Sequence, residues 1–142
     1  ADYWMSQHMI KKRINDGGNI INIGSIEAVL PFKSELVHYS IAKAGVIALT
    51  RSIANEYGHK GFRANVILPG GIRTEGTKKI ARGVFKLKFG LVKDALNFMR
   101  RVPLKRIGEP DEVANICLVL ASDLSSYMTG AVIPVDGGFL SS

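Results

Sequence analysis

Several features that mark common protein classes are scarce or missing in this 142-residue sequence. A single cysteine excludes an internal disulfide bond and a cysteine metal cluster, which fits the reducing cytosol. No apolar run approaches the roughly 20 residues of a membrane-spanning helix, and no secretory signal opens the chain. The sequence therefore predicts a cytoplasmic protein with no membrane contact.

Aromatic residues are also few, at 8% of the chain, whereas the net charge is +7. A positive balance can indicate nucleic acid or acidic partners. The basic residues are spread, however, and no aromatic residues are interleaved with them as on a base-stacking surface. We therefore expect a solvated charged surface and no nucleic-acid partner. An anionic substrate or an acidic protein partner is the second interpretation.

Segments with strand and helix character alternate along the chain. Strands are expected at 19–24, 63–68 and 131–135, and helices at 1–15, at 39–57 and from Pro110 onward. Gly58 is expected to end the second helix, and Pro134 indicates an edge position or a strand end for the last strand. Such alternation with long crossovers predicts an α/β fold whose parallel sheet is covered on both faces.

The predicted sheet is small for a complete domain of this type. It has three strands, and one long side of the first strand lacks a neighbour. The first helical segment also starts without a capping residue, with Ala1 and Asp2 already in the pattern. These features are typical of half a doubly wound domain. We interpret residues 1–142 as the C-terminal part of a doubly wound, Rossmann-like domain.

Tyr39 and Lys43 form a candidate proton-transfer pair. They lie four residues apart at the start of the second helix, so their side chains share one face. An ammonium beside a phenol favours the phenolate, and such a pair can exchange a proton with an alcohol or a carbonyl. The spacing by itself is close to what chance gives, and the alternative is an exposed tyrosine beside a solvated lysine.

Other polar and flexible residues are expected near this pair. Ser25 follows the first strand and the Pro69–Gly71 turn follows the second, and open α/β sheets bind ligands at the carboxyl ends of their strands. The two glycines would let the backbone approach a flat ligand closely, although a plain turn and a loop hydroxyl are the alternatives. Glu27 and Glu35 could contact hydroxyls of a polar substrate, or could be ordinary surface carboxylates.

Taken in order, these segments resemble the short-chain dehydrogenase/reductase family over nearly all of the chain. The resemblance rests on Asn-Ile-Gly-Ser at 22–25, Tyr-Ser-Ile-Ala-Lys-Ala-Gly at 39–45, Arg-Ala-Asn-Val-Ile-Leu-Pro-Gly at 63–70, Arg-Ile-Gly-Glu-Pro-Asp-Glu-Val-Ala at 106–114, and 129–138, which ends in Asp-Gly-Gly. It implies an oxidoreductase that uses NAD or NADP. Hydride would pass between the nicotinamide and the carbon of a secondary alcohol or ketone, with a sugar or polyol as one substrate class.

The resemblance also implies roles for individual residues. Ser25 would hold the substrate oxygen, Tyr39 would be the general acid/base, and Lys43 would favour its phenolate and bind the ribose hydroxyls. The implied cofactor contacts are Tyr39, Lys43, Pro69, Gly70, Ile72 and Thr74. No metal ion is implied. The segment 75–104 resembles the variable substrate loop of the family.

Three parts of the family pattern have no counterpart in residues 1–142. These are the N-terminal Gly-rich turn, the residue that selects NAD or NADP, and the catalytic asparagine. The resemblance therefore implies that the N-terminal cofactor-binding half is absent from this segment and that the segment alone does not turn over substrate.

Two further hypotheses stay open beside a general alcohol, sugar or polyol dehydrogenase. One is a 3-oxoacyl-(acyl-carrier-protein) reductase, whose acidic carrier would suit the positive charge and Lys60. The other is a non-catalytic fragment that only oligomerises. The resemblance implies a homo-oligomer, a tetramer, with the first helix and the Tyr39 helix at the interface. Trp4 and Met5 on the first helix suit such an interface, and an intramolecular core is the equal alternative.

Overall fold

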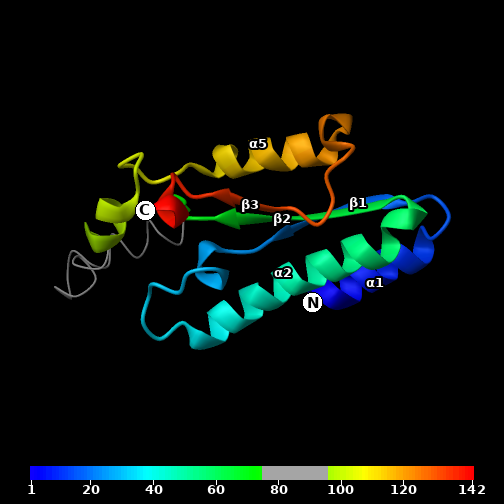
Figure 1. The fold of residues 1–142 in the computed structure, drawn as a ribbon, viewed down its shortest axis with the longest axis horizontal. Coiled ribbons are helices and arrows are strands. Elements are labelled where there is room, and N and C mark those ends of the chain that lie inside the picture. The colour runs from blue at the N-terminus through cyan, green and yellow to red at the C-terminus, as the bar shows by residue number, and fades with distance from the viewer. Residues whose placement is uncertain (75–95) are drawn as a thin grey trace.

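The computed structural model describes residues 1–74 and 96–142 of the chain. The strands β1 (Gly18–Ile23), β2 (Phe62–Pro69) and β3 (Val132–Val135) form a parallel sheet in the order β1-β2-β3. Helices α1 (Asp2–Lys12) and α2 (Val37–Tyr57) lie on one face of this sheet, and α5 (Pro110–Ala121) lies on the other (Figure 1). The predicted α/β fold with a three-stranded parallel sheet is confirmed.

The central strand β2 organises the core. It pairs with β1 from Gly18↔Phe62 to Ile23↔Ile67, and with β3 on its other side. Its apolar residues are almost completely buried because helices cover both faces, which explains the nearly continuous apolar sequence of the strand. β3 is an edge strand in the described sheet, as Pro134 indicated. β1 pairs only with β2 within the described residues.

Two hydrophobic clusters divide the core along the strands. The first contains Ile10, Ile20, Ile53, Ala54, Phe62 and Ala64, and packs α1 and α2 against the amino ends of β1 and β2. The second contains Ile26, Val46, Val66, Leu68, Val102 and Phe139, and lies toward the carboxyl ends of the strands. This second cluster supports the segments that carry the predicted site residues.

The end of α2 differs from the prediction that Gly58 stops the helix. Gly58 has helical dihedral angles (φ −57°, ψ −41°) and leads into the short 3-10 helix η2 (Gly58–Lys60). The left-handed residue is Gly61 (φ 78°), three positions later. A Cβ on the neighbouring Gly17 would lie 2.5 Å from the Gly61 carbonyl oxygen. The turn before β2 therefore needs glycine at 61, and the turn before β1 needs glycine at 17, because these two turns are in contact.

The structure describes only part of the segment 75–104, which resembles the variable substrate loop. Its residues 75–95 lie outside the described part of the chain. Residues 96–101 form a short helix, and the Phe98 ring of this helix stacks on Phe139 at 4.8 Å between ring centres. Over the two described ranges, no helix combines the length and the apolar character that crossing a membrane requires.

Candidate active site

The carboxyl ends of the three strands lie together at one end of the sheet, and we call this region the carboxyl end. The short 3-10 helix η1 (Ile26–Ala28), the start of α2 and the C-terminal segment gather there (Figure 1). Parallel pairing makes this unavoidable, because every strand runs in the same direction. Ser25, the Tyr39–Lys43 pair and the Pro69–Gly71 turn therefore occupy the same end of the sheet.

Tyr39 and Lys43 lie in the first two turns of α2. The Lys43 Nζ lies 5.9 Å from the centre of the Tyr39 ring and donates a hydrogen bond to the Ile23 carbonyl oxygen at 2.8 Å. This bond fixes the ammonium beside the phenol at the end of β1. Tyr39 keeps 37% of its surface exposed, so a small molecule can reach it. An ammonium has three N–H donors, and the other two have no acceptor within the described residues.

Ser25 follows β1 and caps η1. Its Oγ accepts a hydrogen bond from the Glu27 backbone N–H at 3.3 Å, and the side chain is buried. The hydroxyl proton of Ser25 has no acceptor in the described part of the chain, so it can be donated to a ligand oxygen. No hydrogen bond joins Ser25 to Tyr39 or Lys43 among the described residues. The three side chains share a region without forming a preassembled hydrogen-bonded network.

The two glycines after Pro69 have reasons inside the chain for lacking a side chain. The Gly70 N–H donates to the Val135 carbonyl oxygen at 3.0 Å, and a Cβ on Gly70 would lie 2.7 Å from the Cα of Asp136. A Cβ on Gly71 would lie 2.6 Å from the ring of Phe98. Close approach of a ligand to this turn stays a prediction, because packing against the Asp136 backbone already requires glycine at 70, and a side chain at 71 would displace the Phe98 ring.

Ile72 and Thr74 continue from this turn. Ile72 forms a parallel bridge with Gly108, in which Gly108 N–H donates to Gly71 C=O at 2.9 Å and Arg73 N–H donates to Gly108 C=O at 2.8 Å. In such a bridge the N–H and C=O of Ile72 itself point to the opposite side of the segment. They form an adjacent donor and acceptor that suit an amide group. Thr74 is the last residue before 75–95.

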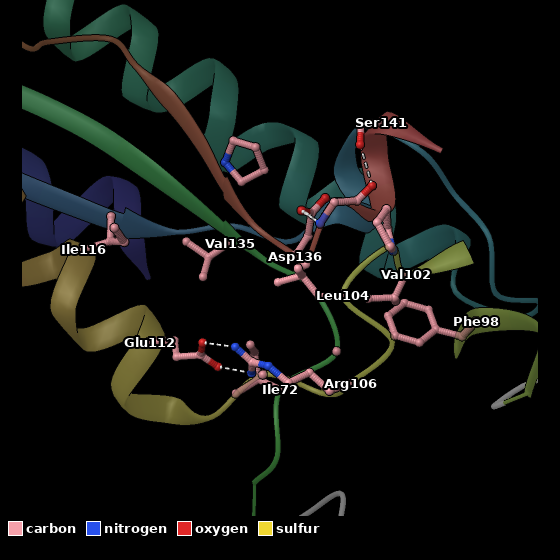
Figure 2. Close-up of a pocket in the computed structure, with 16 residues that line it drawn as sticks. Ile72, Phe98, Val102, Leu104, Arg106, Glu112, Ile116, Val135, Asp136 and Ser141 are labelled. Carbon is pink, nitrogen blue, oxygen red and sulfur yellow. Dashed lines mark hydrogen bonds and ion pairs between the residues drawn. The ribbon is translucent and has the colours of Figure 1, made fainter. Parts of the chain in front are cut away.

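A pocket of about 570 Å³ adjoins the turn on the α5 side of the sheet (Figure 2). Its walls come from the start of α5, the end of β3 and the segments around Ile72 and Leu104. The volume is within the usual range for small-molecule sites. Ser25, Tyr39 and Lys43 do not line this pocket, because they lie on the α2 side. Of the residues that the sequence placed near the site, Gly71 and Ile72 belong to its wall.

The strongest charge pair at this pocket joins Arg106 to Glu112. The guanidinium donates to both carboxylate oxygens, at 2.7 and 2.6 Å (Figure 2). Glu112 also accepts the Glu109 backbone N–H at 2.8 Å, within a capping box at the start of α5. The Arg106 bonds, followed by that backbone bond, lower the pKa of Glu112 from 4.5 to about 2. This pair was not among the predicted site residues, although two glutamates three residues apart around Pro110 are a recognisable capping signal.

Known proteins resemble this chain over most of its length. A family model described as enoyl-(acyl carrier protein) reductase matches residues 3–140. The chain is 40% identical over 132 residues to the 3-oxoacyl-(acyl-carrier-protein) reductase of Chlamydia pneumoniae. This match covers 93% of this chain and 48% of that protein. It is 38% identical over 133 residues to the L-rhamnose-1-dehydrogenase of Scheffersomyces stipitis, with 94% of this chain and 47% of that protein covered.

A solved structure shows the same fold. It is an Agrobacterium tumefaciens protein named as a 2-deoxy-D-gluconate 3-dehydrogenase, with bound NADP. The TM-score is 0.84 at 28% identity, and the match covers 99% of this chain and 54% of that one. The chain thus spans about half the length of the relatives it matches. The family match over residues 3–140, together with these relatives, shows that the chain belongs to the short-chain dehydrogenase/reductase family.

Proposed function

We propose that these residues serve an NAD- or NADP-dependent oxidoreductase that interconverts secondary alcohols and ketones, with sugars or polyols as the favoured substrates. The observation that carries this proposal is the Lys43 ammonium, which is bonded to the Ile23 carbonyl oxygen and lies beside the exposed Tyr39 ring at the carboxyl end of the sheet. The sugar dehydrogenases among the relatives support the substrate class.

The residues present fit a nicotinamide cofactor. The two remaining Lys43 N–H donors suit ribose hydroxyls, and the outward N–H and C=O of Ile72 suit a carboxamide. Pro69 and Gly70 belong to the turn before Ile72, Thr74 follows Ile72, and all three would complete the contacts on this side. When bound, the cofactor supplies or accepts the hydride. One solved relative contains NADP, which supports the cofactor class without deciding between NAD and NADP.

The proton chemistry belongs to this chain's own side chains. In carbonyl reduction, the Tyr39 hydroxyl donates its proton to the substrate oxygen, and in alcohol oxidation the Tyr39 oxygen accepts that proton. The Lys43 ammonium lies 5.9 Å from the centre of the Tyr39 ring, so its positive charge is close to the group that gives or takes the proton. The Ser25 hydroxyl donates a hydrogen bond to the same substrate oxygen and holds it toward Tyr39.

We propose further that residues 1–142 are the C-terminal catalytic half of the domain, and that a cofactor-binding half precedes them in the complete polypeptide. The coverage of about half of each relative supports this division. The single cysteine supports a cytoplasmic location.

The protein would form a homo-oligomer, a tetramer, whose subunits contact one another through the surfaces of α1 and α2. Trp4 and Met5 on α1 are 75% and 73% exposed, and Ile41 on α2 is 68% exposed. Large apolar side chains gathered on neighbouring helices suit burial between subunits. Light scattering on the complete polypeptide should give a mass four times that of one chain, whereas a monomeric mass would contradict the assembly.

A 3-oxoacyl-(acyl-carrier-protein) reductase is the second candidate, because a relative of that name is 40% identical. Its carrier substrate is acidic, and Lys60 is an exposed cation at the end of η2. This candidate predicts that Lys60→Glu reduces activity toward a carrier-bound substrate and leaves a free substrate unaffected. If the Lys60→Glu variant keeps equal activity on the carrier-bound and the free substrate, the general dehydrogenase is favoured.

Deuterium transfer tests the proposed function directly. The complete polypeptide is incubated with a panel of ketones and with NADH or NADPH that carries deuterium at both positions of nicotinamide C4. Mass spectrometry should find one deuterium on the carbinol carbon of the product. The 142-residue segment alone should give no product, because its cofactor contacts come from one side only. Absence of transfer by the complete polypeptide would favour the non-catalytic, oligomerising alternative.

A further inference from the structure

The Phe98 ring lies directly against the turn that follows β2. Phe98 belongs to the short helix at 96–101 and forms part of the pocket wall (Figure 2). A Cβ on Gly71 would lie 2.6 Å from Cε1 and 2.9 Å from Cζ of this ring. Gly71 is not among the residues with a positive φ, so its backbone angles would accept alanine. The Phe98 ring is therefore the group that a side chain at position 71 would displace.

A second aromatic side chain holds the Phe98 ring. The two rings stack, with 4.8 Å between the ring centres of Phe98 and Phe139 and 23° between their planes. Phe139 is completely buried and lies three residues after Asp136, whose backbone packs against Gly70. Phe98 and Asp136 therefore contact the two neighbouring glycines of the turn, and they come from segments that are themselves packed together.

The position of this turn determines where the backbone of Ile72 lies. The Gly71 C=O accepts the Gly108 N–H at 2.9 Å, and the Arg73 N–H donates to the Gly108 C=O at 2.8 Å. The peptides around Ile72 are trans, so the N–H and C=O of Ile72 face away from Gly108. They are the donor and acceptor proposed to bind the cofactor carboxamide. A shift of Gly71 would move both groups.

We propose that Phe98 is a positioning residue for the nicotinamide carboxamide and that it acts through Gly71. This inference rests on the proposed function, in which the Ile72 backbone binds that carboxamide. A ring packed against a glycine restricts the movement of the backbone, because close-packed interiors contain few voids. Hydrogen-bonding groups that are already in position bind a ligand more tightly than groups that must first be ordered. Phe98 thus raises the affinity for the carboxamide through the backbone of another residue.

Calorimetric titration of the complete polypeptide with two dinucleotides tests this role. One is NAD⁺ or NADP⁺, whichever binds, and the other is its 3-acetylpyridine analogue, in which a methyl group replaces the carboxamide NH₂. The analogue cannot donate to the Ile72 C=O, so the wild type should bind it about 3- to 10-fold more weakly, the ratio that one hydrogen bond provides. Phe98→Leu should remove most of this preference, because the backbone groups are no longer held in position. The preference is a ratio of two dissociation constants, so a smaller fraction of folded protein does not change it.

A double-mutant cycle shows whether Phe98 acts through Gly71. Gly71→Ala should also reduce the preference for the natural dinucleotide, because its Cβ displaces the ring or the turn. Leucine is flexible and leaves room for this Cβ, so Gly71→Ala should have little further effect when it is combined with Phe98→Leu. The combined loss of preference should therefore be clearly smaller than the sum of the two separate losses.

Phe32→Leu is the matched control within the same aromatic cluster. The Phe32 ring contacts Phe98 at 5.3 Å and Phe139 at 4.7 Å between ring centres, whereas the three atoms nearest a Cβ on Gly71 all belong to Phe98. Phe32→Leu and Phe98→Leu should both lower the melting temperature, since each removes aromatic contacts. Phe98→Leu should change the dinucleotide preference and Phe32→Leu should not, a difference that loss of packing alone would not produce.

Several results would overturn the inference. A lower melting temperature with an unchanged preference in Phe98→Leu would assign Phe98 a purely structural role. An equal loss of preference in Phe32→Leu would indicate a general loosening of the carboxyl end, and additive losses in the cycle would exclude action through Gly71. A wild type that binds both dinucleotides equally does not read the carboxamide with the Ile72 backbone. Each of these results leaves the proposed reaction standing, whereas a wild type that binds neither dinucleotide and transfers no deuterium contradicts that reaction as well.

Discussion

The two ends of the sheet use their polar groups in opposite ways. At the amino end, the Arg63 guanidinium donates to the carbonyl oxygens of Leu120, Ser122 and Ser125 and to the Ser125 hydroxyl, at 2.9 to 3.3 Å. These bonds satisfy carbonyls at and beyond the end of α5, where a cation is also favoured by the helix dipole. Asn65 donates to Met128 C=O and accepts from Ala131 N–H, which fixes the loop before β3.

At the carboxyl end, the polar groups keep unused capacity. Lys43 has two free N–H donors, Ser25 has a free hydroxyl proton, and Glu27 has a free carboxylate oxygen, all judged within the described residues. Folding could have satisfied these groups internally, as it does at the amino end. Asn19 Oδ1 is an exception at the amino end, since it is buried without a partner among the described residues. Arg63 and Asn65 are otherwise bonded within the chain, whereas Lys43 and Ser25 at the carboxyl end keep donors that a ligand can use.

The largest expected effect comes from Tyr39→Phe at the carboxyl end. Removing the proposed proton donor should lower kcat by about 10²- to 10⁴-fold, because general acid–base catalysis contributes on that scale. The melting temperature should stay the same, since Tyr39 is exposed and makes no hydrogen bond within the described residues. Steady-state kinetics on the complete polypeptide measure the change. Tyr57→Phe at the other end of α2 is the control, and a comparable loss there would contradict the assignment.

Arg63→Lys should produce the opposite pattern at the amino end. A lysine cannot reproduce the forked bonds to three carbonyls, so we expect a loss of about 2–3 kcal/mol in the free energy of unfolding. Urea unfolding measures this loss, and kcat per folded molecule should be unchanged. Arg51→Lys on the exposed surface of α2 should shift stability by less than about 0.5 kcal/mol. A large drop in kcat with unchanged stability for Arg63→Lys would contradict the structural role of the amino end.

A pair of glycine substitutions sharpens the comparison further. Gly70→Ala should cost about 1–3 kcal/mol, because its Cβ would overlap Asp136. Gly58→Ala should instead stabilise the fold by about 0.4–1 kcal/mol, because Gly58 has helical angles and open space where a Cβ would lie. Chemical denaturation of both variants tests the difference in sign. Equal destabilisation by the two substitutions would show that Gly58 has a role that its backbone angles do not reveal.

The smallest effect is expected for Glu112→Gln at the pocket beside α5. The pKa of Glu112 is lowered from 4.5 to about 2 in the folded protein, so its ionised form favours folding. This contribution is complete above about pH 4.5 and disappears as the pH falls through about 2. The variant should therefore melt slightly below the wild type at pH 7 and together with it near pH 2. Melting curves in added salt should shrink the difference at pH 7, since the ion pair is exposed.

Much of the fold could be predicted because it depends on local patterns. The apolar runs at β1 and β2 and the apolar periodicity of α5 identify these elements, and their alternation predicts the parallel sheet. The placement of Ser25 and Tyr39 at one end then follows from the strand direction. The end of α2 could not be predicted, because a glycine tolerates helical and left-handed angles equally.

The unsatisfied groups at the carboxyl end depend on tertiary packing. The sequence left Glu27 open between a hydroxyl contact and a surface carboxylate, and its burial is visible only once η1 packs beside α2. The Asn22 amide likewise donates to the Thr50 hydroxyl at 2.9 Å across 28 residues of sequence. No local pattern links such partners, since their distance is set by the crossover that joins β1 to α2.

Hydrogen–deuterium exchange on the complete polypeptide, with and without NAD or NADP, tests the functional difference between the two ends most directly. Bound cofactor should slow amide exchange at 24–29 and 69–74, at the carboxyl end, and should leave 122–130 unchanged at the amino end. Protection confined to 122–130, or equal protection at both ends, would contradict the assignment of the carboxyl end as the functional one.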